Sequence, residues 1–241
     1  MSNDLSDLLT ADFGFDVSRG NYADCTPLNI FGFNNTLSTD FETIWNDSTA
    51  YVFPTQALEM TLVSTSGSDT MDVLISGLDA QYHMISEVVT LTGTSPVTTD
   101  KLFFRINSVV ILSGSNVGNI TVKNGTVTYG FIGPEIGLTQ ACVYTVPAGH
   151  ALYIFRITAN SATATGSQYV TIRNYTKSHT GRILRVASAT MGHSQVDYNR
   201  QIPFKVDEKT DFQFEAKSSS SSNVVAMFIE GILQNKVPGS L

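Results

Sequence analysis

The chain has 241 residues, a formal net charge of −7 and a hydrophobic fraction of 42%, which is enough for a folded core and excludes a disordered protein. No apolar run approaches the roughly 20 residues that a membrane-spanning helix needs, so we expect no membrane partner. Charged side chains make up only 15% of the chain, against about 25% in an average globular protein. A surface rich in Ser, Thr and Asn is typical of extracellular β modules, lectins and virion proteins.

The charges are unevenly distributed along the chain. Residues 1–137 hold 4 basic and 15 acidic side chains, a net charge of −11, whereas residues 138–241 hold 10 basic and 6 acidic side chains, a net charge of +4. A bipolar molecule can dock its basic half on an acidic neighbour. The alternative is that two β domains simply differ in surface composition.

The N-terminal segment, residues 1–20, does not alternate cleanly, although Leu5, Leu8 and Leu9 fit one weak helical turn. We interpret it as an N-terminal arm that orders against a partner. It has no basic start followed by an apolar core, so we expect no secretory signal and synthesis in a cytoplasm. The next segment, 22–52, is turn-rich with isolated apolar anchors, and Ser38 to Glu42 could cap a very short helix.

A series of short Val, Ile, Thr, Leu and Phe runs follows, separated by Gly, Asn, Asp and Ser. Such spacing without intervening helical segments predicts an all-β sandwich, and we place the first β-sandwich domain at residues 21–135. Asn124-Gly125 predicts a hairpin with a type I′ turn, which needs positive φ at both positions. The predicted strands are 58–63, 71–75, 88–91, 101–106, 119–122 and 126–129.

The second half repeats this style after a Gly- and Pro-containing connection at 130–138. We place the second β-sandwich domain at residues 138–236, so the predicted fold is two jelly-roll-like β-sandwiches with a short arm. Pro203 should lie at a strand end or on an edge strand, since it cannot donate to a ladder. Ser218 to Ser222 is interpreted as a hairpin loop. The predicted strands are 142–146, 151–157, 169–173, 181–186, 212–216 and 224–233.

Neither the cysteines nor the histidines form a recognisable site. Cys25 and Cys142 do not make a disulfide framework; we expect two free, buried thiols, although a pairing is left open because it depends on the fold. His83, His150, His179 and His193 show no metal-binding spacing. We therefore assign no catalytic, cofactor-binding or metal-binding residue, and we expect no cofactor.

Two acidic groups are weak candidates for glycan hydrolysis, which needs a pair of carboxylates across a cleft. They are Asp69/Asp72 and Asp207/Glu208/Asp211, and both groups lie beside turns, where Asp commonly caps backbone N–H groups. This structural interpretation is favoured. A glycan-degrading enzyme remains an alternative that would require Asp207 or Asp211 for activity.

Two further groups could support binding. Basic residues interleaved with Tyr175 run through 173–177 and 182–185, but nucleic-acid binding would need a denser patch and a positive total charge, so we expect none. We interpret Arg182 and Arg185 as solvated or partner-facing residues. Trp45 and Tyr51 could stack on sugars in a carbohydrate-binding host-adhesion module, but burial of Trp45 is the favoured alternative.

Several segments taken in order resemble a family of tailed-bacteriophage virion structural proteins that is frequent among marine phages. The resemblance covers residues 18–235, and the N-terminal arm lies outside it. Its motifs are Ile30-Phe31-Gly32-Phe33-Asn34, Glu42-Thr43-Ile44-Trp45-Asn46, Tyr51-Val52-Phe53-Pro54, Ser76-Gly77-Leu78-Asp79, the run 87–93, Tyr144-Thr145-Val146-Pro147-Ala148-Gly149 and Glu208-Lys209-Thr210-Asp211.

The resemblance implies a non-enzymatic, repeated component of the virion, assembled in the host bacterial cytoplasm, and it supplies no catalytic residues. Capsid decoration or cementing is the expected role, and a tail, collar or fibre-associated protein is the alternative. The implied partners are other virion proteins, such as the major capsid or tail proteins. The chain itself is a further partner, as a homotrimer or higher symmetric oligomer.

Overall fold

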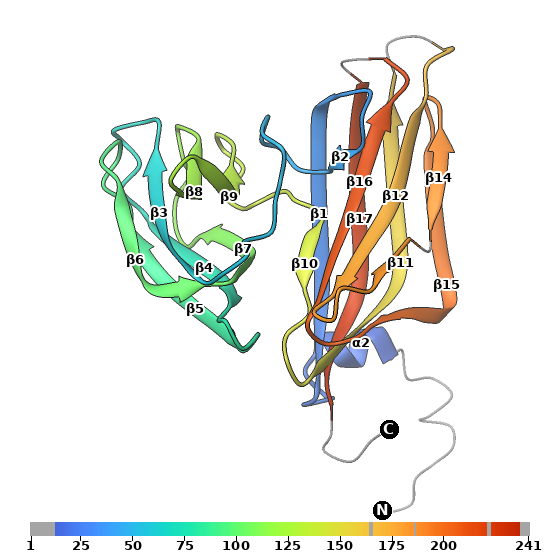
Figure 1. Ribbon diagram of the computed structural model, residues 1–241, viewed down its shortest axis with the longest axis horizontal. Coiled ribbons are helices and arrows are strands. Elements are labelled where there is room, and N and C mark those ends of the chain that lie inside the picture. Colours follow the sequence, from blue (N-terminus) through green and yellow to red (C-terminus); the bar gives the residue numbers. More distant parts are fainter. Residues whose placement is uncertain (1–12, 164–165, 186, 221–222, 237–241) are drawn as a thin grey trace, which may run out of the picture.

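The computed structural model describes residues 13–163, 166–185, 187–220 and 223–236, and 60% of the chain is strand against 3% helix. Two antiparallel β-sandwiches lie side by side, the smaller at the left of Figure 1 and the larger at the right. The prediction of an all-β sandwich fold is confirmed. Among the described residues, no helix is both long and apolar enough to cross a membrane.

The smaller sandwich packs the sheet β6-β3-β8-β9 against the sheet β5-β4-β7. Its strands alternate buried and exposed side chains, so that Met60 and Leu62 of one sheet and Val73 and Ile75 of the other are fully buried. The strands are β3 (Leu58–Ser64), β4 (Asp72–Leu78), β5 (Met84–Thr90), β6 (Val97–Phe103), β7 (Arg105–Ile111), β8 (Ile120–Asn124) and β9 (Val127–Ile132).

Two details of this sandwich differ from the sequence prediction. The predicted strand 101–106 is divided at Phe104, because β6 ends at Phe103 in one sheet and β7 begins at Arg105 in the other. The predicted hairpin exists, but Asn124 still pairs with Val127, so its turn is Gly125-Thr126. Gly125 alone of these two has positive φ, +58°, which fits a type II′ turn rather than type I′.

The larger sandwich packs the four strands β1-β17-β11-β15, here called the β1 sheet, against β10-β16-β12-β13, here called the β16 sheet. Strand β14 also pairs with β12, and β2 with β16. The strands are β1 (Cys25–Leu37), β2 (Glu42–Thr43), β10 (Val143–Thr145), β11 (His150–Ala162), β12 (Val170–Ser178), β13 (Ile183–Leu184), β14 (Ser188–Met191), β15 (Gln195–Val206), β16 (Thr210–Ser218) and β17 (Asn223–Asn235).

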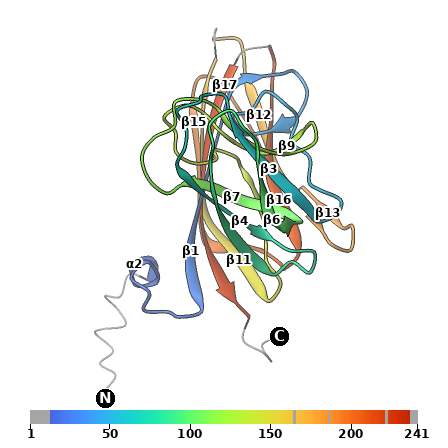
Figure 2. The ribbon, with the colours of Figure 1, turned by 90° about the vertical axis from the view of Figure 1, so that its left-hand side faces the viewer.

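The strand pairing divides the domains differently from the expected ranges 21–135 and 138–236. Strand β1 pairs with β17 from Cys25 opposite Gln234 to Asn34 opposite Val225, and β2 pairs with β16. Both therefore belong to the larger sandwich, and the smaller sandwich is an insertion between β2 and β10. Figures 1 and 2 both show β1 beside β17, although almost the whole chain separates them in sequence.

The segment before the insertion differs most from the prediction. The 13-residue strand β1 lies where a turn-rich segment was expected, and the expected helix near Ser38 is absent from these described residues. Instead, the Glu42 carboxylate accepts the backbone N–H of Ser38 and a side-chain N–H of Asn34. Gly32 and Asn34 occupy buried positions of β1, so the strand lacks the continuous apolar alternation that would have identified it.

Other predictions have mixed outcomes. In the predicted strand 181–186, of which residue 186 lies outside the described part, the described residues form a strand only at β13 (Ile183–Leu184), whereas β15 was not predicted. Pro203 does lie on an edge strand, β15, in a bulge between Asn199 and Phe204. The predicted serine loop joins β16 to β17, with residues 221–222 outside the described part.

Cys25 and Cys142 are both free; Cys142 is buried, as expected, and Cys25 is only half-buried.

A short helix, α2 (Phe13–Ser18), lies at one end of the larger sandwich (Figure 1). Phe13 lines a shallow apolar pocket with Tyr153, Phe155 and Ile232 on the outer face of the β1 sheet. Part of the expected N-terminal arm is therefore ordered against its own chain. The weak turn at 5–9 lies outside the described residues.

Candidate functional site

A buried ion pair joins the two sandwiches. Arg105, at the start of β7, reaches Asp211 of β16 with two parallel hydrogen bonds: Nε donates to Oδ1 at 2.7 Å and Nη2 donates to Oδ2 at 2.9 Å. Only 5% of Arg105 and 7% of Asp211 are exposed. The hydroxyl of Thr145 also donates to Asp211 Oδ1 at 2.8 Å. This fork geometry fixes the orientation of the pair as well as its charge.

The remaining donors and the planar face of Arg105 are also satisfied. Its Nη1 donates to the carbonyl oxygens of Pro54 and Phe104, both at 2.7 Å. Its guanidinium carbon lies 3.9 Å from the ring centre of Phe104, 5.2 Å from that of Phe53 and 5.9 Å from that of Tyr82. Because a buried charge is tolerated only when it is paired and hydrogen-bonded, Arg105 acts as a structural cation.

Neutral hydrogen bonds complete the junction. The Asn107 side chain accepts the backbone N–H of Thr145 at 2.9 Å and donates to the Thr145 carbonyl at 3.0 Å. The backbone N–H of Ala148 donates to the carbonyl of Tyr82 at 2.8 Å. Together with the ion pair, these contacts hold the smaller sandwich in one orientation on the larger.

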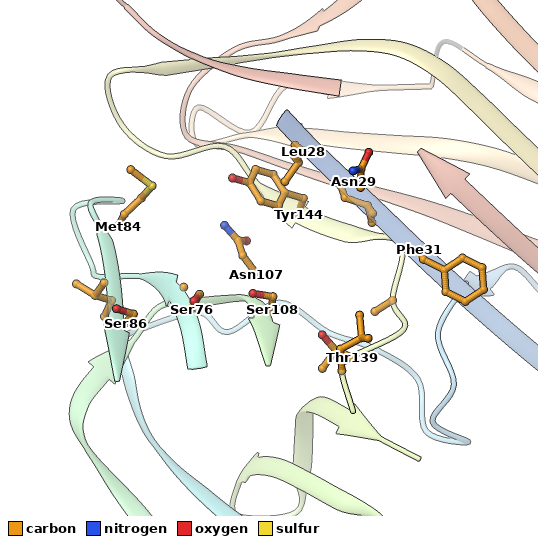
Figure 3. Close-up of a pocket in the computed structure, with 15 residues that line it drawn as sticks. Leu28, Asn29, Phe31, Ser76, Met84, Ser86, Asn107, Ser108, Thr139 and Tyr144 are labelled. Carbon is orange, nitrogen blue, oxygen red and sulfur yellow. The ribbon is translucent and has the colours of Figure 1, made fainter. Parts of the chain in front are cut away.

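A cleft of about 470 Å³ opens beside this junction. One wall is the outer face of the sheet β5-β4-β7, which contributes Ser76, Ser86 and Ser108. The other wall is β1, from Leu28 to Phe31, together with Tyr144. Figure 3 shows the three serines in a row below Tyr144 and Leu28. Cavities of this size at domain junctions are common small-molecule sites.

The acidic residues considered for glycan hydrolysis are separated by their hydrogen bonds. Asp211 forms its ion pair with Arg105, and Asp207 pairs with Lys205 at 3.1 Å. Glu208 accepts the backbone N–H of Gly149 and pairs with the Lys236 ammonium. The contacts of Gly149 and Lys236 hold the pKa of Glu208 below its ordinary value. The structure therefore gives these carboxylates structural partners and does not bring them together as a catalytic pair.

The other acidic pair supports the capping interpretation. The buried Asp69 accepts the Ser64 hydroxyl at 2.5 Å and the backbone N–H groups of Val117 and Gly118 at 2.8 and 2.9 Å. Burial by itself raises the pKa of Asp69, but these hydrogen bonds outweigh it and hold the pKa below 3.8. Asp72 accepts the Thr90 hydroxyl at the edge of the sheet.

The histidines and the basic residues stay apart. Within the described residues, no group of three or more His, Cys, Asp or Glu side chains could hold a metal ion. Arg173 pairs with Glu215 at 2.6 Å and stacks at 3.6 Å on the ring centre of Phe41. Arg182 and Arg185 are exposed, in agreement with their interpretation as solvated or partner-facing residues.

Trp45 is buried, with 3% of its surface exposed, and its indole N–H donates to the carbonyl of Thr49 at 2.8 Å. Its ring meets that of Tyr51 edge to face at 5.2 Å. Burial raises the pKa of Tyr51, although the nearby Arg105 opposes this effect. Neither aromatic ring forms an exposed platform for sugars, so the favoured prediction for Trp45 is confirmed.

Comparisons with known proteins give little support to any assignment. No protein-family model matches the chain, and no curated protein matches it. Among solved structures, the chain is similar to the D431N mutant VP2 protein of infectious bursal disease virus in T=1 particles, with 9% identity and a TM-score of 0.21 over 89% of this chain and 74% of that one. The structure of the Gx strain of infectious bursal disease virus gives 12% identity and a TM-score of 0.22 over 89% of this chain and 77% of that one. At these scores the similarity carries no argument about this chain.

Sequence reasoning missed both parts of the junction. Arg105 had a detectable signal, since a lone Arg inside an apolar strand-like run is unusual unless it is paired. Asp211 was considered only as a catalytic carboxylate or a turn cap. The serine row had no signal, because the three serines become neighbours only through strand register.

Proposed function

We propose that this chain is a non-enzymatic structural component of a tailed-bacteriophage virion, a capsid decoration or cement protein that assembles with copies of itself and with the major capsid protein. The ordered motifs over residues 18–235 support this proposal. The structural observation that carries it is an aromatic surface on the outer face of the β1 sheet. A tail, collar or fibre-associated position is the alternative.

This aromatic surface is built by paired strands. Phe31 of β1 lies directly opposite Phe228 of β17, and Phe33 lies two residues further along the same face of β1. Phe228 is 36% exposed, and the other two rings are partly exposed. Adjacent aromatic rings on an open sheet face gain burial when a second molecule covers them, and aromatic residues are enriched in interfaces.

The outer face of the β16 sheet, on the opposite side of the larger sandwich, carries charged side chains. Arg173 and Lys177 of β12 share the outer face of the β16 sheet with Lys217 of β16, since these positions alternate with buried ones. The molecule therefore presents aromatic residues on one side and charged residues on the other, where Glu215 pairs with Arg173 and leaves Lys177 and Lys217 as the additional cations. A repeated particle component that contacts like and unlike neighbours needs two such surfaces.

The oligomeric state of the purified chain tests self-assembly. Light scattering after size-exclusion chromatography should give a symmetric oligomer for the wild type and a monomer for Phe228→Asp. Ile202→Asp is the matched control, because Ile202 is 81% exposed on β15, away from the aromatic surface; it should leave the oligomer intact. A monomeric wild type at about 100 μM, a concentration that populates even weak complexes, would contradict the proposal.

Electron cryomicroscopy of the parent particle tests the position. Copy numbers follow particle symmetry, so density for this fold at several hundred sites, on the order of one per capsomer position, identifies a decoration protein. A few dozen copies or fewer, confined to a vertex or the tail, would favour the alternative. Particles without this chain would overturn the virion assignment.

A further inference from the structure

The wall of the cleft on the smaller sandwich carries three serines in one cross-strand row. Ser76 of β4 lies opposite Ser86 of β5 on one side and opposite Ser108 of β7 on the other. Residues directly opposite each other share a face of the sheet, so all three side chains point outward into the cleft (Figure 3). With neighbouring strands about 4.8 Å apart, the hydroxyls form a row roughly 10 Å long.

These hydroxyls are free to bind a ligand. No hydrogen bond joins any of the three to another side chain or backbone group of the described residues. Each hydroxyl offers one donor and two acceptor positions. The adjacent row on the same face is aliphatic, with Leu74 between Val88 and Val110. Because strand interiors favour such residues, local strand stability does not account for three aligned serines.

The facing wall adds peptide groups and an aromatic ring. Leu28 to Phe31 are consecutive, and side chains on a strand alternate, so four consecutive residues can line one cavity only where the strand presents its edge. β1 is indeed an edge strand, so we infer that the edge of residues 28–31 that does not pair with β17 borders the cleft. Tyr144 closes this side, with its hydroxyl turned toward the open space in Figure 3.

Charge restricts the class of ligand. Of the described residues that line the cleft, none is Asp, Glu, Lys or Arg. Phosphates, carboxylates and ammonium groups would therefore lose hydration without gaining a partner. A ligand that presents hydroxyls to the serine row and C–H surface to the apolar residues beside it would satisfy both kinds of wall.

We propose that this cleft binds a neutral carbohydrate of one or two sugar units. Its volume of about 470 Å³ lies within the range of about 300–1,000 Å³ typical of small-ligand pockets. The two walls belong to different sandwiches, and the Arg105–Asp211 and Asn107–Thr145 contacts fix the distance and orientation between them. The site is thus formed before the ligand arrives, which lowers the entropic cost of binding.

Titration of the purified chain with maltose, cellobiose, lactose and sucrose, each followed by protein-observed NMR, tests this proposal. At least one disaccharide should give saturable shifts with a Kd of roughly 0.1–10 mM, a range that corresponds to about −5 to −3 kcal/mol. The variant Ser76→Ala/Ser86→Ala/Ser108→Ala should weaken binding at least about tenfold, the loss expected from removing hydrogen bonds to a bound ligand. Thr128→Val is the matched control, because it removes a hydroxyl from β9 outside the cleft, and it should bind as the wild type does.

A second variant covers the case in which the triple variant does not fold. Ser86 is exposed on the edge strand β5, so Ser86→Trp should fold and fill the cleft, and it should abolish the shifts. The proposal is overturned if no disaccharide gives saturable shifts at concentrations up to about 100 mM, ten times the weakest expected Kd. Binding that survives Ser86→Trp would also overturn it. Saturable binding of an extended neutral hexapeptide alone would assign the cleft to strand addition along β1 instead.

Discussion

The Arg105–Asp211 pair allows a direct test of how the two sandwiches are held together. In Asp211→Ala, Arg105 keeps its two carbonyl acceptors but loses the only carboxylate that it contacts among the described residues. Thr145 also loses the acceptor of its hydroxyl. The variant therefore leaves a cation uncompensated at a site that is 5% exposed.

The expected loss of unfolding free energy is about 3–5 kcal/mol, the usual result of removing one partner of a buried pair. In urea this loss should lower the unfolding midpoint by about 1–2 M, for a denaturant dependence of roughly 2–3 kcal/mol per molar. Tryptophan fluorescence can follow the transition, because Trp45 lies at the junction, beside Tyr51 and Ala141.

The chain supplies its own control. Arg156 and Asp197 have the same fork geometry, with N–O distances of 3.0 and 2.9 Å, but their side chains are 44% and 38% exposed. Asp197→Ala should have a far smaller effect, since water screens the pair and solvates the remaining charge. The double variant Arg105→Met/Asp211→Leu should recover most of the lost stability. Equal losses for Asp211→Ala and Asp197→Ala would refute burial as the cause.

Three further predictions concern single sites. Gly77→Ala should lower the unfolding free energy by about 1–3 kcal/mol, because its Cβ would meet the carbonyl oxygen of Arg105 at 2.0 Å. A Cβ on Gly67 would meet nothing within 4 Å, so Gly67→Ala should be tolerated in the same urea unfolding assay. The pKa of Asp69 is lower in the folded protein than its ordinary value of 3.8, so the ionised carboxylate stabilises the fold above pH 3.8 and loses this effect as the pH falls through its native pKa. The difference in unfolding free energy between the wild type and Asp69→Asn should therefore shrink below pH 3.8. A difference that stays constant with pH would contradict this. A thiol reagent should modify Cys25 in the native protein, slowly because burial and the neighbouring Asp24 raise the pKa of its thiol. Cys142 should react only on unfolding, because it is fully buried and burial raises the pKa of its thiol; Cys25→Ser should remove the native-state reaction.

The smaller sandwich was predictable because its strands are short, are rich in β-branched and apolar residues, and are separated by turn residues. Val73 and Ile75 point inward at the spacing that the sequence shows, and Gly125 marks the hairpin to within one residue. The division at Phe104 was not predictable in this way. The run 101–106 contains no Gly, Pro, Asn or Asp to mark a break, and the change of sheet appears only in the tertiary structure, where Gly77 lies against the carbonyl of Arg105.

The larger sandwich was harder to predict because its first strand depends on distant residues. Gly32 lies in β1 because Cys142 and Ile44 pack directly against it, where a Cβ would meet the Cys142 sulfur at 2.4 Å. No local pattern can show that requirement. The same limitation applies to the cleft and the ion pair, since strand register and tertiary contact bring Ser76, Ser108 and Asp211 into place.

The pairing of β1 with β17 has a consequence for biosynthesis. The first strand of the larger sandwich emerges from the ribosome before the whole inserted sandwich, whereas its partner Asn223–Asn235 emerges only after strands β2 to β16. The inserted sandwich is complete once residue 132 has emerged, and its contacts are more local, so it can fold while translation continues. Until β17 has emerged, β1 lacks its partner strand and lies beside an already folded neighbour. A nascent chain stalled before β17 should therefore contain one native sandwich and one open, aggregation-prone half.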